Sequence, residues 1–162
     1  MIFFCMSACI KDGNQEPGQQ ETEYISQGDN LPIFIVTQSD GTMVGTDNLL
    51  GNWSVIVFFN TSCGDCRQLL PVLEDFYRTT CIANDIRFIC ISREEGAEKT
   101  SRYWKENNLT MPYSSQDDRR VFNLFAHSGV PRVYVSDPNG VVRHVFRSAA
   151  PPTLGDLQES IK

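Results

Sequence analysis

A buried-strand pattern followed at once by a pair of cysteines constrains this chain more than any other feature. Residues 55–59 form an uninterrupted apolar run of β-branched and aromatic side chains, which is typical of a strand covered on both faces. Cys63-Gly64-Asp65-Cys66 follows after three polar residues and opens a segment whose apolar positions recur at helical spacing. The two cysteines are therefore predicted to lie at a strand-to-helix junction.

This position predicts how the cysteines react. The first turn of a helix has unpaired N–H groups and a partial positive charge, which favour a thiolate at Cys63. A thiolate attacks disulfides, so we expect Cys63 to attack and Cys66, one turn further in, to resolve the product. The helix end contributes roughly 0.3–2 kcal/mol. Because Asp65 opposes that effect, we expect a fairly reducing couple and not a strong oxidant.

Structural zinc is an alternative interpretation of the cysteine pair. A closed zinc site needs two further ligands, usually a second close pair of Cys or His. Cys81 and Cys90 are nine residues apart, and His127 and His144 are isolated. The spacing therefore favours a thiol–disulfide couple and predicts no metal site.

Two further motifs accompany the cysteine pair: Pro71 lies eight residues after Cys63, and Gly129-Val130-Pro131 lies about sixty residues further on. With these motifs the chain resembles the thioredoxin fold over roughly residues 31–161. It is most similar to the TlpA/ResA-like group of exported thiol–disulfide oxidoreductases. The resemblance implies an α/β fold, with a central mixed β-sheet flanked by helices on both faces.

The same resemblance implies a site and partners. Val130-Pro131 is expected to be a cis peptide that faces Cys63 and offers backbone groups to an extended substrate. Gly64, Asp65 and Pro71 would support the motif. Protein disulfides are the implied substrates and a membrane thiol donor the implied source of electrons, with no organic cofactor.

Three positions depart from the family pattern. Ser62 replaces a Trp that commonly precedes the first cysteine. Val57 and Leu69 stand where thioredoxins and ResA-like proteins, respectively, carry an acid. Both usual proton acceptors for the second thiol are thus replaced, so we expect resolution by Cys66 to be slow and steeply pH-dependent.

The N-terminal residues 1–28 differ in composition from the rest of the chain. About eight apolar residues are too few to span a bilayer, which needs roughly twenty, but they fit a truncated signal peptide. Met6-Ser7-Ala8-Cys9 resembles a bacterial lipobox. This predicts lipidation at Cys9, a flexible tether before a domain over residues 29–162, and a membrane-anchored lipoprotein in the periplasm. The alternative is a polar tail with a chance cysteine.

Composition limits the partners. The chain has 162 residues, is 41% hydrophobic and carries a net charge of −6, which suits one globular domain plus a tail. Because no cluster of Lys and Arg is present to bind phosphates, we expect no nucleic-acid partner. Contact with the membrane is expected only through Cys9.

Hydrophobic periodicity predicts the remaining elements. A hairpin over residues 31–36 and 41–44 is expected to extend the sheet. The others are strands 53–59 and 86–91, helices 63–79 (kinked at Pro71), 94–107 and 117–126, a hairpin over 132–136 and 141–147, and a terminal helix 153–161 capped by Thr153. His127, after the third helix, is better explained as a capping residue than as a base facing the dithiol.

The sequence therefore predicts an enzyme, a monomeric oxidoreductase that reduces extracytoplasmic protein disulfides. One alternative is a non-enzymatic binding module, because a fold does not fix a function. Another is a thiol peroxidase of the peroxiredoxin type, whose Pro-x-x-x-Thr-x-x-Cys signature is not matched. Asn60 stands where that signature has Thr, and Ile56 stands where it has Pro.

Overall fold

The computed structural model describes residues 24–162 of the chain. The predicted lipidation site Cys9 and most of the predicted tether lie outside this part. In the part that is described, no helix combines the length and the apolar character needed to cross a bilayer.

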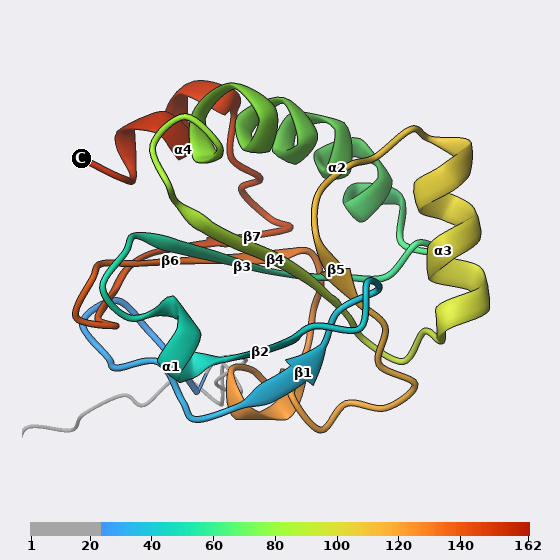
Figure 1. Cartoon of the computed structure of the whole chain (residues 1–162), viewed down its shortest axis with the longest axis horizontal. Coiled ribbons are helices and arrows are strands. Elements are labelled where there is room, and N and C mark those ends of the chain that lie inside the picture. Colours follow the sequence, from blue (N-terminus) through green and yellow to red (C-terminus); the bar gives the residue numbers. More distant parts are fainter. Residues whose placement is uncertain (1–23) are drawn as a thin grey trace, which may run out of the picture.

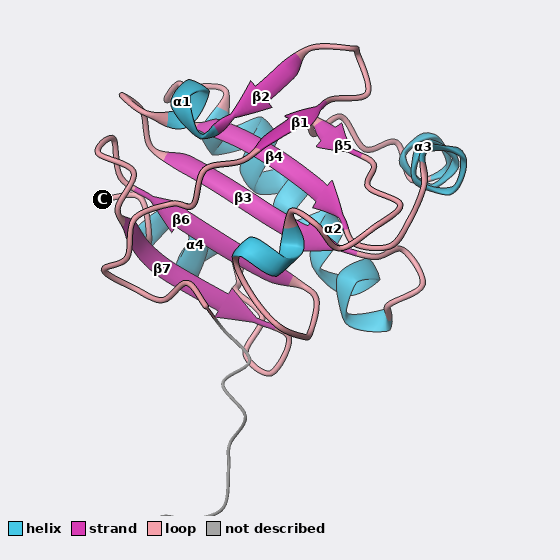
Figure 2. Ribbon diagram, turned by 90° about the horizontal axis from the view of Figure 1, so that it is seen from below, coloured by secondary structure: helices cyan, strands magenta, loops and turns pink. Residues whose placement is uncertain are grey.

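A mixed five-stranded sheet lies at the centre of the fold, in the order β5-β4-β3-β6-β7 (Figure 2). Its middle strand β3 pairs in parallel with β4 and antiparallel with β6, so neighbours cover both of its edges. Every residue of β3 is buried, as its uninterrupted apolar run predicts. The strands are β3 Ser54–Phe59, β4 Arg87–Ser92, β5 Tyr113–Ser114, β6 Arg132–Ser136 and β7 Val142–Arg147.

Helices cover both faces of this sheet (Figure 1). Helices α2 (Gly64–Phe76) and α4 (Leu154–Glu159) lie on one face, while α1 (Thr46–Leu49) and the 3-10 turn η2 (Phe122–Leu124) lie on the other. Helix α3 (Ala97–Glu106) stands beside the β5 edge. The predicted α/β architecture with a mixed sheet is therefore confirmed.

Helix α2 packs directly on the sheet. Leu70, Leu73 and Phe76 are almost completely buried, and burial of each such side chain stabilises the fold by about 1.5–3 kcal/mol. Pro71 lies inside the helix, which continues through it and ends in the π-helical turn η1 (Tyr77–Cys81). This packing fixes the first turn of α2 against the end of β3.

The N-terminal hairpin forms, but the prediction that it extends the central sheet is wrong. Strands β1 (Ile35–Thr37) and β2 (Met43–Gly45) make a separate two-stranded sheet. Phe34 packs edge-on against Phe125, with ring centroids 5.7 Å apart, and its N–H donates to Thr46 Oγ1 (3.0 Å). These contacts hold the hairpin across one face of the sheet (Figure 1), and the Ser114 hydroxyl of β5 donates to the Thr37 carbonyl at the end of β1 (2.6 Å).

The helix predicted over residues 117–126 is also wrong, because only the three residues of η2 are helical there. Asp118 Oδ1 accepts a hydrogen bond from the N–H of Arg120 (2.9 Å), and the Asp118 carbonyl accepts one from the N–H of Glu94 (3.1 Å). Such local bonds compete with helix formation. The acids that resemble a helix start therefore build a loop.

Helix α3 begins three residues later than predicted. Glu94 has a φ of +56°, in the left-handed region, and Gly96 is the N-cap. Ala97 is exposed, whereas Thr100 and Trp104 are the buried residues of this helix.

Candidate active site

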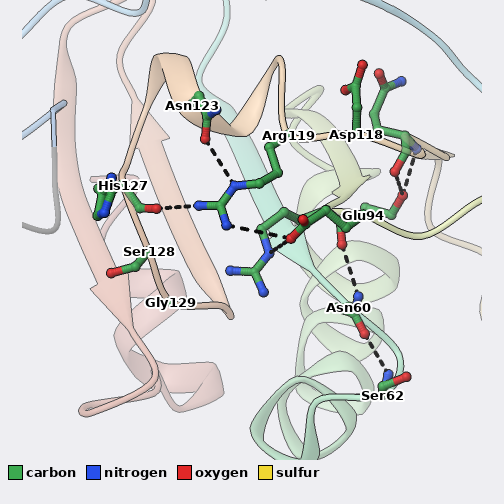
Figure 3. A network of polar contacts seen from close by, with 12 residues as sticks. Asn60, Ser62, Glu94, Asp118, Arg119, Asn123, His127, Ser128 and Gly129 are labelled. Atoms are coloured by element: carbon green, nitrogen blue, oxygen red, sulfur yellow. Dashed lines mark hydrogen bonds and ion pairs between the residues drawn. The ribbon is translucent and has the colours of Figure 1, made fainter.

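The cysteine pair lies where β3 ends and α2 begins, as predicted. Cys63 is the N-cap of α2, and its N–H donates to the Asn60 carbonyl (3.0 Å). The Asn60 side chain shapes the turn, because its Oδ1 accepts a hydrogen bond from the N–H of Ser62 (2.9 Å; Figure 3). Its Nδ2 donates to the Arg93 carbonyl (3.0 Å). The turn is thus fastened to the end of the neighbouring strand β4.

Cys63 and Cys66 are free cysteines with different surroundings. Cys63 is partly exposed, and its thiol donates to the Val130 carbonyl at 3.4 Å. Cys66 is completely buried, and this burial raises the pKa of its thiol well above the ordinary range. The nearby Cys63 raises it further, whereas the backbone of Asn60 and the charge of Arg93 lower it. This asymmetry fits the predicted order, in which Cys63 attacks and Cys66 resolves.

The loop before β6 completes the site. Val130-Pro131 is a cis peptide, and its carbonyl contact with Cys63 confirms the predicted juxtaposition. The Arg132 side chain is nearly buried and donates from Nε to the carbonyls of Gly129 (3.0 Å) and Ser128 (3.1 Å). The Arg132 side chain therefore fixes the backbone of this loop. The role of the loop in substrate binding stays a prediction.

A buried carboxylate supports the turn before Cys63. Glu95 is 3% exposed and accepts hydrogen bonds from the N–H (3.0 Å) and the hydroxyl (2.7 Å) of Thr61. Its Oε1 also pairs with Lys99 Nζ (2.8 Å), and this ammonium donates to Ser62 Oγ. The start of α3 is thereby joined to the cysteine turn.

Two arginines link the cysteine turn to the loop before Pro131. The guanidinium carbons of Arg93 and Arg119 lie 5.3 and 5.4 Å from the ring centroid of Phe122. Both side chains pair with Oε2 of Glu94, at 3.5 and 3.6 Å. Arg119 also donates to the His127 carbonyl, which Figure 3 shows beside it.

The surface around the motif is open. A side chain at Gly64 would meet nothing within 4 Å. A groove of about 420 Å³ begins at Asp65 and runs along Leu69 and Val72 of α2 to Pro151, before α4. This groove therefore lies beside the cysteine motif, which it meets at Asp65.

Residues 27–145 match the AhpC/TSA family. The chain belongs to this family. The matched region of this AhpC/TSA member contains strand β3, the cysteine turn and the cis-proline loop.

Individual relatives agree with this assignment. The thiol-disulfide oxidoreductase ResA of Bacillus subtilis is 22% identical over 141 residues, which cover 86% of this chain and 78% of ResA. A thioredoxin-family thiol:disulfide interchange protein from Chlorobium tepidum superposes with a TM-score of 0.72, at 21% identity over 84% of this chain and 95% of that one. StoA from Bacillus subtilis gives 0.68, at 18% identity over 81% and 97%. The predicted thioredoxin fold and the resemblance to ResA-like proteins are confirmed.

Other candidate residues of this AhpC/TSA chain lie elsewhere. His127 is exposed, and its Nδ1 lies 3.3 Å from the Tyr24 hydroxyl. Cys81 and Cys90 are buried, which raises the pKa of Cys81 to about 12 and that of Cys90 well above its ordinary value. Within residues 24–162, no three His, Cys, Asp or Glu side chains are grouped so as to hold a metal ion.

Arg93, Glu95 and Lys99 are not among the site residues that the sequence predicts, because charged residues in and before a helix ordinarily form solvated surface. One signal for Arg93 was available. It directly follows the buried strand β4, whose parallel pairing with β3 places both strand ends at the edge that carries Cys63. For Glu95, which follows a residue with positive φ, hydrophobic periodicity carries no such signal.

Proposed function

We propose that this protein reduces disulfide bonds of extracytoplasmic proteins through a Cys63/Cys66 dithiol. The observation that carries the proposal is the placement of a partly exposed Cys63 thiol at the N-cap of α2, close to the fully buried Cys66. The contact of Cys63 with the Val130 carbonyl supports a substrate position next to it. Similarity to ResA supports the same reaction class.

The proposed reaction has two exchange steps. The Cys63 thiolate attacks a substrate disulfide, forms a mixed disulfide and releases one substrate sulfur as a thiolate. Cys66 then loses its proton and attacks Cys63 Sγ, so the second substrate sulfur leaves as a thiolate and takes up a proton. The substrate gains two electrons, and the protein is left with a Cys63–Cys66 disulfide. Backbone groups of Val130 would pair with the substrate as an added strand.

Direction and location are parts of the proposal with their own support. A reductase is favoured because Asp65 lies in the first turn of α2, where an acid opposes the stabilisation that a helix end gives to a thiolate. Location outside the cytoplasm, lipidation at Cys9 and recharging by a membrane thiol donor rest on the lipobox-like residues and on the resemblance to ResA-like proteins. Protein substrates are supported by the open groove beside Asp65.

The test compares two activities of the purified full chain. We expect catalytic reduction of an artificial disulfide with dithiothreitol as electron donor, and loss of this activity in Cys63→Ser. A thiol peroxidase would instead consume peroxide faster than it reduces the disulfide. A binding module would show neither activity above the Cys63→Ser background, and either outcome would refute the proposal.

A further inference from the structure

The groove beside the cysteine motif has an apolar floor. It lies on the face of the sheet that α2 and α4 cover (Figure 1). Leu69 and Val72 line it from α2, and Leu154 lines it from the start of α4. Pro151 and Pro152, in the segment before α4, line it as well. The apolar surface that the groove leaves open to solvent is stabilised when apolar side chains of a partner cover it.

Acids line the α2 side of this groove at both of its ends. Asp65 and Asp75 are both exposed, and no Lys or Arg is among the lining residues. Within residues 24–162, neither carboxylate forms an ion pair or accepts a hydrogen bond. Two free carboxylates favour a partner with positive charges, because complementary charges determine partner choice and association rate.

The spacing of the two acids gives the length of the partner segment. The lining residues of α2 lie at positions 65, 68, 69, 72 and 75, which is the spacing of one helix face. Asp65 and Asp75 are ten residues apart, so they are about 15 Å apart along the helix axis. An extended chain covers this length in about four to five residues.

The groove also adjoins both parts of the candidate active site. Asp65 lies between the two cysteines of the motif. Ser148, another lining residue, follows Arg147 of β7, which pairs in register with Arg132, the residue after the cis-proline. The part of a substrate that flanks its reacting cysteine is therefore the part nearest to the groove.

We propose that this groove binds the segment next to the reacting cysteine of the substrate, and that it selects segments in which apolar residues stand between two Lys or Arg residues. The inference rests on the proposed function and names a substrate class for it. Apolar side chains of the segment cover Leu69 and Val72, while its cations pair with Asp65 and Asp75. No bond forms or breaks in the groove, so the exchange steps at the cysteines are unchanged.

The test uses short synthetic peptides with one central cysteine, each oxidised to its disulfide-linked dimer. Outward from the cysteine, both arms of the basic peptide read Lys-Val-Leu-Val-Lys, so the direction of binding does not matter. Glu replaces Lys in an acidic peptide, and Gln replaces it in a neutral one. The full chain, with Cys5 and Cys9 replaced by Ser, reduces each peptide with dithiothreitol as electron donor. Each kcat/KM is divided by the rate constant of dithiothreitol alone with the same peptide.

We expect the basic peptide to be reduced about tenfold faster than the acidic one at low salt, since each exposed charge pair changes the rate by up to about fivefold. Asp75→Lys should bring this ratio to about one. The net charge of −6 by itself attracts basic peptides. The matched control is therefore Glu106→Lys, which changes the net charge equally at an exposed residue of α3 outside the groove and should keep the ratio.

A fourth peptide tests the apolar floor. It keeps the Lys residues of the basic peptide but has Ser in place of Val and Leu, and it should be reduced about fivefold more slowly.

The inference is overturned if the basic and acidic peptides react equally fast, or if Glu106→Lys lowers their ratio as much as Asp75→Lys does. It is equally overturned if the Ser-containing peptide reacts as fast as the basic one. These outcomes leave the proposed function intact. The proposed function itself fails if no peptide is reduced faster than by the Cys63→Ser variant.

Discussion

Cys63 and Cys66 lie within one turn of each other at the start of the same helix but differ in solvent exposure. Cys63 is the N-cap and partly exposed, while Cys66 is sealed against the sheet. Access therefore decides which sulfur a large substrate can reach first.

This asymmetry predicts which variant captures substrates. Cys66→Ser should accumulate protein adducts through Cys63, because the mixed disulfide forms and then finds no resolving thiol. Cys63→Ser should accumulate none. The measurement is electrophoresis of a periplasmic extract without reductant after incubation with each variant. Adducts on Cys63→Ser would reverse the assignment of the attacking thiol.

Asp65 predicts the redox potential of the couple. Because this acid in the first turn of α2 opposes the effect of the helix end on a thiolate, the potential should lie nearer about −270 mV, as in thioredoxin, than about −120 mV, as in DsbA. Asp65→His should make the couple more oxidising, because a stabilised reduced form raises the potential. Equilibration with glutathione measures both proteins, and Asp75→His, further along α2, is the control. Equal potentials for Asp65→His and the unmutated protein would show that the charge of Asp65 does not matter.

At the scale of single residues, the sequence predicts those that belong to a fixed motif. It does not predict those that reach the site from another segment of the chain. Cys63, Cys66 and the Val130-Pro131 peptide were located because spacing along the chain determines their environment. Arg93 and Glu95 were not, since their contacts depend on how the chain leaves β4. A left-handed Glu94 turns Glu95 inward, and apolar periodicity does not encode that conformation.

Among the elements, the turn between β3 and α2 is held by a neighbouring segment as well as by its own Asn60. The Glu95 carboxylate satisfies both the N–H and the hydroxyl of Thr61. Loss of such a buried acceptor leaves the donors unpaired, at a cost of about 1–3 kcal/mol.

We therefore expect Glu95→Ala to lower the free energy of unfolding by about 1–3 kcal/mol and to slow the reaction of Cys63 with disulfides. Urea denaturation measures the first effect. Glu98→Ala is the matched control, because Glu98 pairs with Arg102 in the same segment but its side chain is 88% exposed, and such pairs contribute about 0–1 kcal/mol. Similar losses in the two variants would argue against a special role for Glu95.

Elements were predictable where one strong pattern determined them. The strand β3, the helix α2 and the cap of α4 by Thr153 follow from apolar runs and a capping residue. The hairpin β1–β2 was placed wrongly, because its pattern specifies pairing within the hairpin but not which face of the sheet Phe34 will cover. The loop around Asp118 was read as a helix because a first-turn acid and a loop-forming acid look alike in sequence.

For the whole molecule, its buried thiols predict a loss of stability at alkaline pH. Burial raises the pKa of Cys66, Cys81 and Cys90 above the unfolded value of about 8.5. Above that pH the unfolded chain loses these protons first, so the native state binds more protons and the free energy of unfolding falls as pH rises. The contribution is complete below about pH 8.5 and, for Cys81, is lost by about pH 12.

The expected slope is about 1.4 kcal/mol per pH unit for each thiol. Urea denaturation of the reduced protein between about pH 8.5 and about pH 10 measures it. Cys81→Ala should remove one thiol's share of the slope. For each protein, the free energy of unfolding near neutral pH is the baseline from which the slope is measured. A free energy of unfolding that stays constant over this range would contradict the prediction.

The carbonyl of Val130 already has a hydrogen-bond donor in the resting molecule, namely the thiol of Cys63 at 3.4 Å. In the proposed reaction that thiol gives up its proton before it attacks, and a thiolate cannot donate. The carbonyl then becomes vacant as the backbone of a substrate arrives, and a substrate N–H can replace the lost S–H. When the dithiol is later recharged, after the substrate has left, the S–H can return to the same oxygen. Loss of one proton from Cys63 therefore both activates the sulfur and frees the carbonyl for the substrate.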